Sequence, residues 1–553
     1  MRDYRRHRVA QPALGKRFVT RLAHVKSNEF KQRSSSVTNC LFNDRTLPWL
    51  PVIAAFFVQF DVLFSGLLFD DFVHFYEISN ISYMDYLRQP HQHLLHSFKT
   101  VLWSVESLFG VNPFVFMLIA LILHLASVRL LFEIVFRLTG KIHLAAFGAA
   151  LWGMEPYAIG TLAWISVHGH AYATTAVLWV LMDVVRYSQK AAVLRTGLLA
   201  RHAFLLLVAA TSFGAGLAST VIFPLVIVIL NPLPSQRNRL LAVYGSVAVA
   251  VVFLYLFSLI DLAAGTDSQS ISVPVDLRDA IIMRSTSLWG GFNDISKTLW
   301  AFVQLFSIGF STLFFGPLVA GKISLITVDS LLLVAPFIAI FIALPLLVFG
   351  VFVSGVNERR RLLAMLLLVC ASYGLIAYAR SGAWFGIHPE AYRYHYLAPA
   401  FMAILFCLIL SKLFDRFPQR LIKQGRVWFA VWLLLVIIPF YLSPDNVVKE
   451  ALLVNQKKQL TDSMQIIDTA LKKSPNQTEI YIANRPFKVF PWGYTPQHFP
   501  GLAALFVMTY PDNTVDGKRV YFLEESEDIV KMVQAKKGTR IADLVISARK
   551  ATQ

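Results

Sequence analysis

Long apolar stretches alternate along this chain with short polar segments that are rich in lysine and arginine. A helix needs about 20 mostly apolar residues to cross the hydrocarbon core of a bilayer. Eleven stretches reach or approach that length, and the pattern therefore predicts an all-α polytopic membrane protein with about eleven transmembrane helices. They cover residues 48–69, 113–136, 143–165, 170–187, 202–230 (two short spans that meet near Gly216), 241–261, 329–354, 362–380, 396–413 and 427–444.

The basic residues between these stretches predict the orientation of the chain. Lysine and arginine accumulate in cytoplasmic loops, and they cluster here at 137–141, at 186–201 and at 412–426. These clusters place the N-terminus in the cytoplasm and the C-terminus outside. The apolar residues 299–319 are ambiguous. If they crossed the membrane, the arginines at 359–361 would lie outside, so we predict an in-plane or re-entrant element there.

Polar regions at both ends complete the predicted organisation. Residues 1–46 carry eleven Lys or Arg against three acids and lack a signal-peptide pattern, which favours a basic cytoplasmic tail. Residues 47–444 form the transmembrane domain, with outer loops at 70–112 and 262–328. Residues 445–553 are polar and contain strand-like runs at 478–483 and 519–523 and a helix-like run at 447–471. They predict a small extracytoplasmic α/β domain.

The composition agrees with a membrane protein. Hydrophobic residues make up 56% of the chain and charged residues only 15%, far from the soluble average. The net charge of +18 does not indicate nucleic-acid binding, because the basic residues flank the apolar stretches as topology signals. Three scattered cysteines do not form a disulfide framework. We therefore expect an integral membrane location.

Two adjacent aspartates, Asp70 and Asp71, follow the first apolar stretch directly. Carboxylates beside hydrocarbon are costly, so a pair there indicates a function. A carboxylate can take a proton from an acceptor or hold a divalent cation such as Mg²⁺ or Mn²⁺. The alternative is a hydrated pair that caps a helix.

The predicted topology brings basic groups to the same outer face as the two aspartates. His168 and His170 lie between two spans, and Arg393 and Tyr394 precede a later one. Arginine and histidine can bind a phosphate group. The alternative for the segment around Arg393 is an interfacial anchor, because Arg and Tyr are common at headgroup level. Within the predicted third span, Glu155 must face protein or water.

Several short motifs follow one another in a fixed order along the chain. After the acidic pair come Arg88-Gln89-Pro90, Leu108-Phe109-Gly110-Val111-Asn112-Pro113, Leu123-His124-Leu125, Arg137-Leu138-Thr139-Gly140, Pro156 and Ala163-Trp164-Ile165-Ser166, with Arg393-Tyr394-His395-Tyr396 as a second anchor. In this order they resemble the GT-C superfamily of membrane glycosyltransferases. The similarity covers about residues 60–190 and is strongest to the bacterial branch related to protein O-mannosyltransferases and tetratricopeptide-containing mannosyltransferases.

The resemblance implies a sugar donor carried on a polyprenyl phosphate and a reaction on the outer face of a bacterial inner membrane. Asp70 and Asp71 would supply the base or hold a metal ion. Arg393 would bind the lipid phosphate. The predicted topology adds His168, His170 and Tyr394 as further candidates for binding this phosphate. The acceptor would be a glycan, a lipid or a protein.

Two other functions fit the same sequence features. One is a transporter of lipids or polyprenyl-linked glycans that uses the outer acidic cavity, although the chain lacks a visible internal repeat of the kind that marks transporters. The other is a non-catalytic envelope scaffold of the same fold, whose C-terminal domain recruits other enzymes.

Overall fold

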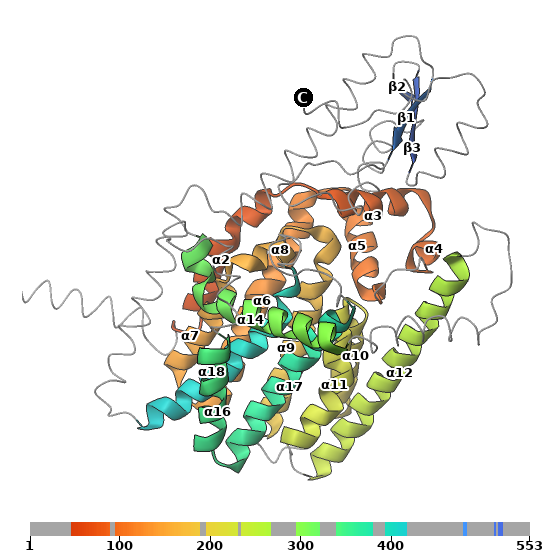
Figure 1. Cartoon of the computed structure of the whole chain (residues 1–553). Coiled ribbons are helices and arrows are strands. Elements are labelled where there is room, and N and C mark those ends of the chain that lie inside the picture. Colours follow the sequence, from red (N-terminus) through yellow and green to blue (C-terminus); the bar gives the residue numbers. More distant parts are fainter. Residues whose placement is uncertain are drawn as a thin grey trace, which may run out of the picture.

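The computed structural model is a bundle of helices that carries a short β-sheet near the end of the chain (Figure 1). The residues that it describes are 46–88, 94–188, 195–230, 234–266, 295–320, 339–379, 393–416, 479–483, 514–515 and 518–523. The predicted tail up to residue 45, the predicted span 427–444 and the helix-like run 447–471 lie outside these residues.

Four of the described helices are long and apolar enough to cross a membrane by length and composition. This finding indicates an integral membrane protein and confirms the predicted helical class, while the count of eleven spans stays a prediction. The four helices are α6 (Pro113–Thr139), α12 (Pro234–Thr266, with the apolar part Gln236–Ser258), α17 (Val356–Ala379) and α18 (Leu397–Arg416).

The first predicted span is shorter than the sequence indicated. Helix α2 (Leu50–Gln59) continues as a 3-10 helix over Phe60–Phe64, and the backbone is then extended at Ser65. The predicted continuous span 48–69 is therefore wrong, because the chain leaves the helix before the acidic pair. Three helices follow, α3 (Phe69–Asn80), α4 (Tyr83–Arg88) and α5 (His96–Phe109), and they gather at one end of the bundle (Figure 1).

The third predicted span is also interrupted. Helix α7 (Ile142–Gly153) ends just before Glu155, whose extended backbone precedes Pro156. Proline disfavours helical conformation at the residue before it and cannot donate a backbone hydrogen bond, which accounts for the break of the predicted span 143–165 at this point. Short helical turns replace it, and the whole segment 154–168 is buried. The short helical turns are Pro156–Ala158, α8 (Ile159–Leu162) and Ile165–Val167, and α9 (Gly169–Ser188) follows them.

The predicted division of the run 202–230 into two helices is confirmed. Three residues separate the end of helix α10 (Thr196–Ala210) from the start of α11 (Gly214–Leu230). A Cβ atom at Gly216 would collide with the carbonyl oxygen of Ala209, so glycine permits the close approach of the two helices. The turn between the two helices packs on the start of α9, because a Cβ on Gly169 would collide with the carbonyl oxygen of Ser212.

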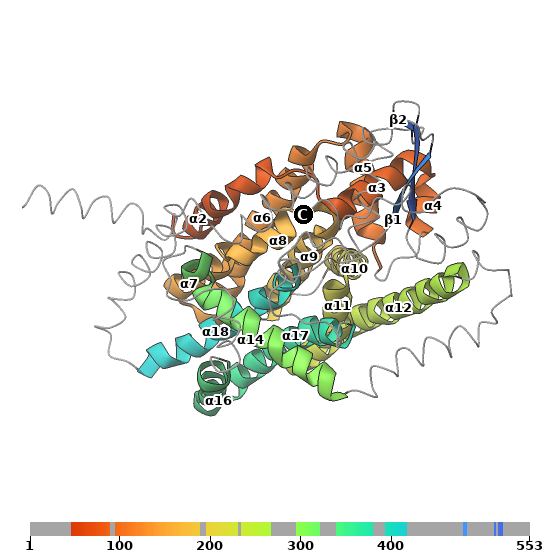
Figure 2. The ribbon, with the colours of Figure 1, turned by 45° about the horizontal axis from the view of Figure 1, so that its top comes forward.

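Helix α14 (Ile295–Ala320) contains the ambiguous apolar residues. It crosses α18 at a steep angle in both ribbon views (Figures 1 and 2) and does not belong to the four candidate membrane helices among the described residues. The in-plane or re-entrant placement stays a prediction. A π-helical turn at Ala339–Ala343 and α16 (Leu344–Val353) come next in the described chain.

Three strands are described in the C-terminal region. The predicted strands are confirmed as β1 (Glu479–Ala483) and β3 (Lys518–Leu523), and β2 (Thr514–Val515) joins them. The strand order is β1-β3-β2, with β1 parallel and β2 antiparallel to β3. The extent of the predicted extracytoplasmic domain stays untested.

Candidate functional site

Asp71 is buried and connects two distant segments of the chain. Ser166 donates its backbone N–H and its hydroxyl to Oδ1 of Asp71, each at 2.7 Å. The backbone N–H of Leu68 donates to Oδ2 at 2.8 Å, which caps the first turn of α3. The alternative prediction, a hydrated aspartate that caps a helix, is therefore correct in one part: Asp71 caps α3. Its carboxyl is not hydrated, because the side chain is fully buried. Its bonds hold the turn at Ser166 against α3.

Arg393 lies against the same turn from another side. Its guanidinium is 4.8 Å from the ring centroid of Trp164 and 5.2 Å from that of Tyr394, and Nη2 donates to the Tyr394 hydroxyl at 3.4 Å. A cation over aromatic faces is held by electrostatic attraction to the rings. Trp164 and Ser166 are two residues apart, so their Cα atoms lie at most about 7 Å from each other. Asp71 and Arg393, the predicted anionic and cationic groups, therefore contact the same short segment.

The position of Arg393 is set by the start of α18. The Tyr396 hydroxyl pairs with Nδ1 of His124 at 2.8 Å, and Trp152 donates its indole N–H to the Tyr396 carbonyl at 2.9 Å. Nε2 of His124 also bonds the carbonyl of Gly153 at 2.9 Å. These bonds tie the residues just before α18 to α6 and to the end of α7. His124 belongs to one of the motifs that resemble the GT-C superfamily, and here it is a buried residue whose hydrogen bonds hold these segments together.

His168 is fully buried beside the same turn. Its Nε2 lies 2.9 Å from the carbonyl oxygen of Leu162, and its Nδ1 has no hydrogen-bond partner among the described residues. Burial lowers the pKa of His168 from 6.5 to about 4, so the ring is neutral at neutral pH. Because a carbonyl only accepts, Nε2 carries the proton and Nδ1 is an acceptor. Such a nitrogen suits a hydroxyl group better than a phosphate oxygen.

A second buried histidine precedes α18. Nδ1 of His395 pairs with the Tyr373 hydroxyl at 3.0 Å, and Nε2 has no partner among the described residues. Desolvation lowers the pKa of His395, which keeps this ring neutral as well. A Cβ on Gly309 of α14 would collide with the Tyr373 hydroxyl, so α14 packs closely over this pair.

Glu155, like His168 and His395, is buried and has one polar side-chain atom without a hydrogen-bond partner among the described residues. It faces protein, as the sequence required of it: Oε1 accepts from the Thr312 hydroxyl of α14 at 2.9 Å, and its carbonyl accepts from Gln59 at 3.0 Å. Oε2 has no hydrogen-bond partner among the described residues. A buried polar atom without a partner is costly. The unused polar atoms of Glu155, His168 and His395 can each bond to a polar ligand or to water.

The other predicted residues occupy the same region in different ways. Asp70 belongs to α3, but its side chain lies outside the described part of the structure. The His170 ring stacks on Phe213 at the α10–α11 turn, with ring centroids 3.8 Å apart. Tyr394 is half-buried beside Arg393. No protein-family model matches the chain, and a search of curated proteins finds no match.

The structure adds residues that sequence reasoning did not assign to a site. Ser166 and Trp164 were visible only as parts of a motif, and here one holds Asp71 and the other Arg393. Thr312, from the ambiguous apolar stretch, pairs with Glu155. As for a metal, no group of three His, Cys, Asp or Glu residues converges within the described residues. Because the Asp70 side chain lies outside them, the metal site stays a prediction.

Proposed function

We propose that this protein is a membrane glycosyltransferase that moves a sugar from a polyprenyl-phosphate donor to an acceptor on the extracytoplasmic side. The observation that carries the proposal is the convergence of Asp71 and Arg393 on the turn at 164–166. A lipid-phosphate donor needs a cation for its phosphate and a carboxylate for the acceptor. Arg393 is the proposed cation, and Asp71 holds the first turn of α3, the helix that also carries Asp70, against the same segment. Neutral buried acceptors such as Nδ1 of His168 suit sugar hydroxyls.

The proposed reaction is a single displacement at the anomeric carbon. An acceptor oxygen or nitrogen forms a bond to that carbon as the bond to the phosphate oxygen breaks. The acceptor proton passes to the carboxylate of Asp70, and the polyprenyl phosphate leaves with the electron pair. Arg393 neutralises the charge on the departing phosphate. Asp71 acts as a positioning residue, because its carboxyl is already engaged by Ser166 and Leu68.

Glu155 is the second candidate for the proton acceptor. It is a further carboxyl of the region, and its oxygen Oε2 is buried without a hydrogen-bond partner among the described residues. Glutamine at this position keeps the size of the side chain and an oxygen for the Thr312 hydroxyl. A loss of transfer in Glu155→Gln with full activity in Asp70→Asn would therefore assign the proton to Glu155.

The test is sugar transfer in membranes that contain the full chain. A panel of polyprenyl-phosphate hexoses and pentoses, labelled in the sugar, is supplied to wild type, Asp70→Asn and Arg393→Gln. We expect transfer to fall at least about 100-fold in both variants, the usual cost of losing a general base or a charge-stabilising group. Asp85→Asn and Arg88→Gln, at exposed positions of α4, are the matched controls and keep full activity. Equal transfer by all five proteins would contradict the proposal.

A further inference from the structure

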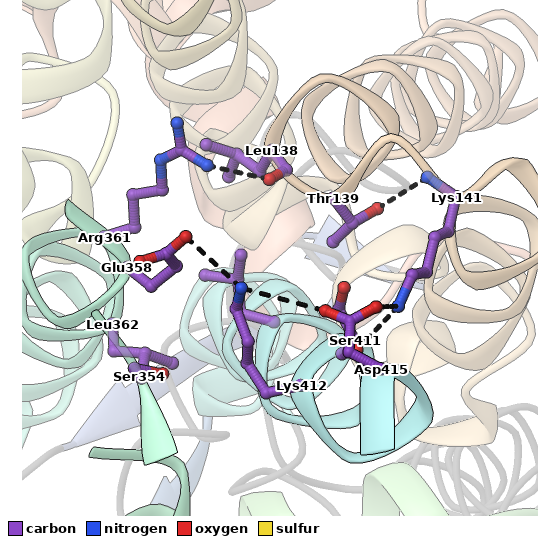
Figure 3. Close-up of a pocket in the computed structure, with 11 residues that line it drawn as sticks. Leu138, Thr139, Lys141, Ser354, Glu358, Arg361, Leu362, Ser411, Lys412 and Asp415 are labelled. Carbon is purple, nitrogen blue, oxygen red and sulfur yellow. Dashed lines mark hydrogen bonds and ion pairs between the residues drawn. The ribbon is translucent and has the colours of Figure 1, made fainter. Parts of the chain in front are cut away.

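A cavity of about 220 Å³ lies at the opposite end of α18 from the candidate site (Figure 3). It sits between the last turns of α6 and α18 and the first turns of α17, and we refer to it as the inner cavity. The charge pattern predicts this end to be cytoplasmic. Its charged lining residues are Lys141, Glu358, Arg361, Lys412 and Asp415, and Thr139, Ser354 and Ser411 add hydroxyl groups.

A chain of ion pairs crosses one side of the inner cavity. Nζ of Lys141 lies 2.6 Å from Asp415, and Nζ of Lys412 lies 3.2 Å from Glu358 and 3.8 Å from Asp415. Figure 3 shows these groups as a connected row. Three basic side chains face two carboxylates here, so the lining carries a net charge of +1. The cavity thus favours an anion.

Arg361 supplies the excess charge. Its Nη1 donates to the carbonyl oxygen of Leu138 at 2.9 Å, and its attraction to the Glu358 carboxylate acts over more than ion-pair distance. A guanidinium has five N–H donors, and this bond uses one of them. The remaining donors on this planar fork match the geometry of a phosphate group.

Ser354 is an independent sign of a missing partner. Its side chain is 4% exposed, it lines the inner cavity, and its hydroxyl has no hydrogen-bond partner among the described residues. A buried hydroxyl without a partner costs about 1–3 kcal/mol. A bound oxyanion would accept a hydrogen bond from this hydroxyl.

We propose that the inner cavity binds a phosphate group, carried by an anionic lipid headgroup or by a free phosphate. Arg361 provides the charge, and the Ser354 hydroxyl donates to a phosphate oxygen. Basic pockets between membrane helices at the cytoplasmic surface bind lipid headgroups in this way. The inner cavity is separated from the candidate site by the length of α18, about 30 Å. It is therefore a second site, and the proposal does not depend on the transferase reaction.

The test measures lipid binding to the full-length protein by native mass spectrometry. Phosphatidylglycerol is titrated into wild type, Arg361→Gln, Ser354→Ala and Arg360→Gln. We expect Arg361→Gln to weaken binding about tenfold, as the loss of one charge-assisted hydrogen bond does, and Ser354→Ala to weaken it several-fold. Arg360→Gln removes the same charge one residue away, outside the lining, and binds within about twofold of wild type.

Two further measurements separate the ligand source from a folding defect. Inorganic phosphate at millimolar concentration displaces the lipid if the site takes the free ion, and leaves it bound if the acyl chains contribute. Without ligand, Ser354→Ala unfolds at the wild-type temperature or higher, because it removes a hydroxyl that has no partner. Equal affinity for phosphatidylglycerol in wild type, Arg361→Gln and Arg360→Gln, with no phosphate binding that depends on Arg361, would overturn the proposal.

Discussion

The two ends of α18 hold their polar groups by different means. At its start, Asp71, His168 and Glu155 are buried and bonded by backbone groups and hydroxyls. At its end, Lys141 and Asp415 form a partly exposed ion pair. The first arrangement fixes side chains in a dry environment and leaves acceptors unused, as a site for chemistry requires. The second is adjustable and accessible to water, as a site for reversible ion binding requires.

The largest expected effect is the loss of Asp71. Asp71→Ala removes the acceptor for three donors, from Ser166 and Leu68, and leaves them buried without partners. At about 1–3 kcal/mol for each such donor, we expect the free energy of unfolding to fall by about 4 kcal/mol. Thermal unfolding in detergent measures it. Asp85→Ala, at an exposed aspartate, is the control. Equal shifts in the two variants would show that the Asp71 bonds do not hold the turn.

Acidification gives the next largest effect. The folded-state pKa of His168 is lowered from 6.5 to about 4, so between these values the unfolded chain binds more protons than the folded one. Stability is therefore complete above pH 6.5 and falls as the pH drops toward 4, by up to about 3 kcal/mol. Carboxylates also titrate in this range, so the readout is the difference between wild type and His168→Asn. Identical pH profiles of the two proteins would refute a neutral buried ring.

The smallest effect belongs to the inner end of α18. Asp415→Asn breaks the ion pair with Lys141 at a position that is half exposed to solvent. Exposed pairs of this kind contribute about 0–1 kcal/mol and are screened by salt. We expect a shift of the unfolding temperature of at most a few degrees at low salt and none at 1 M salt. A destabilisation as large as that of Asp71→Ala would remove the contrast between the two ends.

The sequence predicted those elements whose signal is local. The apolar runs of α6, α9 and α18, the break before Gly216 and the strands β1 and β3 follow from hydropathy and residue type. Hydropathy alone did not reveal that helix ends at Phe64 and at Gly153, because it counts apolar residues and not backbone bonds.

The candidate site was only partly readable for a related reason. Asp71, His168 and Arg393 stood out by charge and by place in the predicted topology. Their partners did not, since the Asp71–Ser166 bond joins residues 95 positions apart and the Glu155–Thr312 bond joins residues 157 apart. No local pattern encodes such a pairing. Only the folded structure shows that the turn at 164–166 contacts both Asp71 and Arg393.

The most direct test of the central claim is photo-crosslinking with a polyprenyl-phosphate sugar that carries a diazirine beside the phosphate. In wild type we expect adducts in segments 155–168 and 393–396, mapped by mass spectrometry. Arg393→Gln loses these adducts and Arg88→Gln keeps them, because only Arg393 lies on the turn at 164–166. Adducts confined to other helices, or labelling that is unchanged in Arg393→Gln, would contradict a donor site at the start of α18.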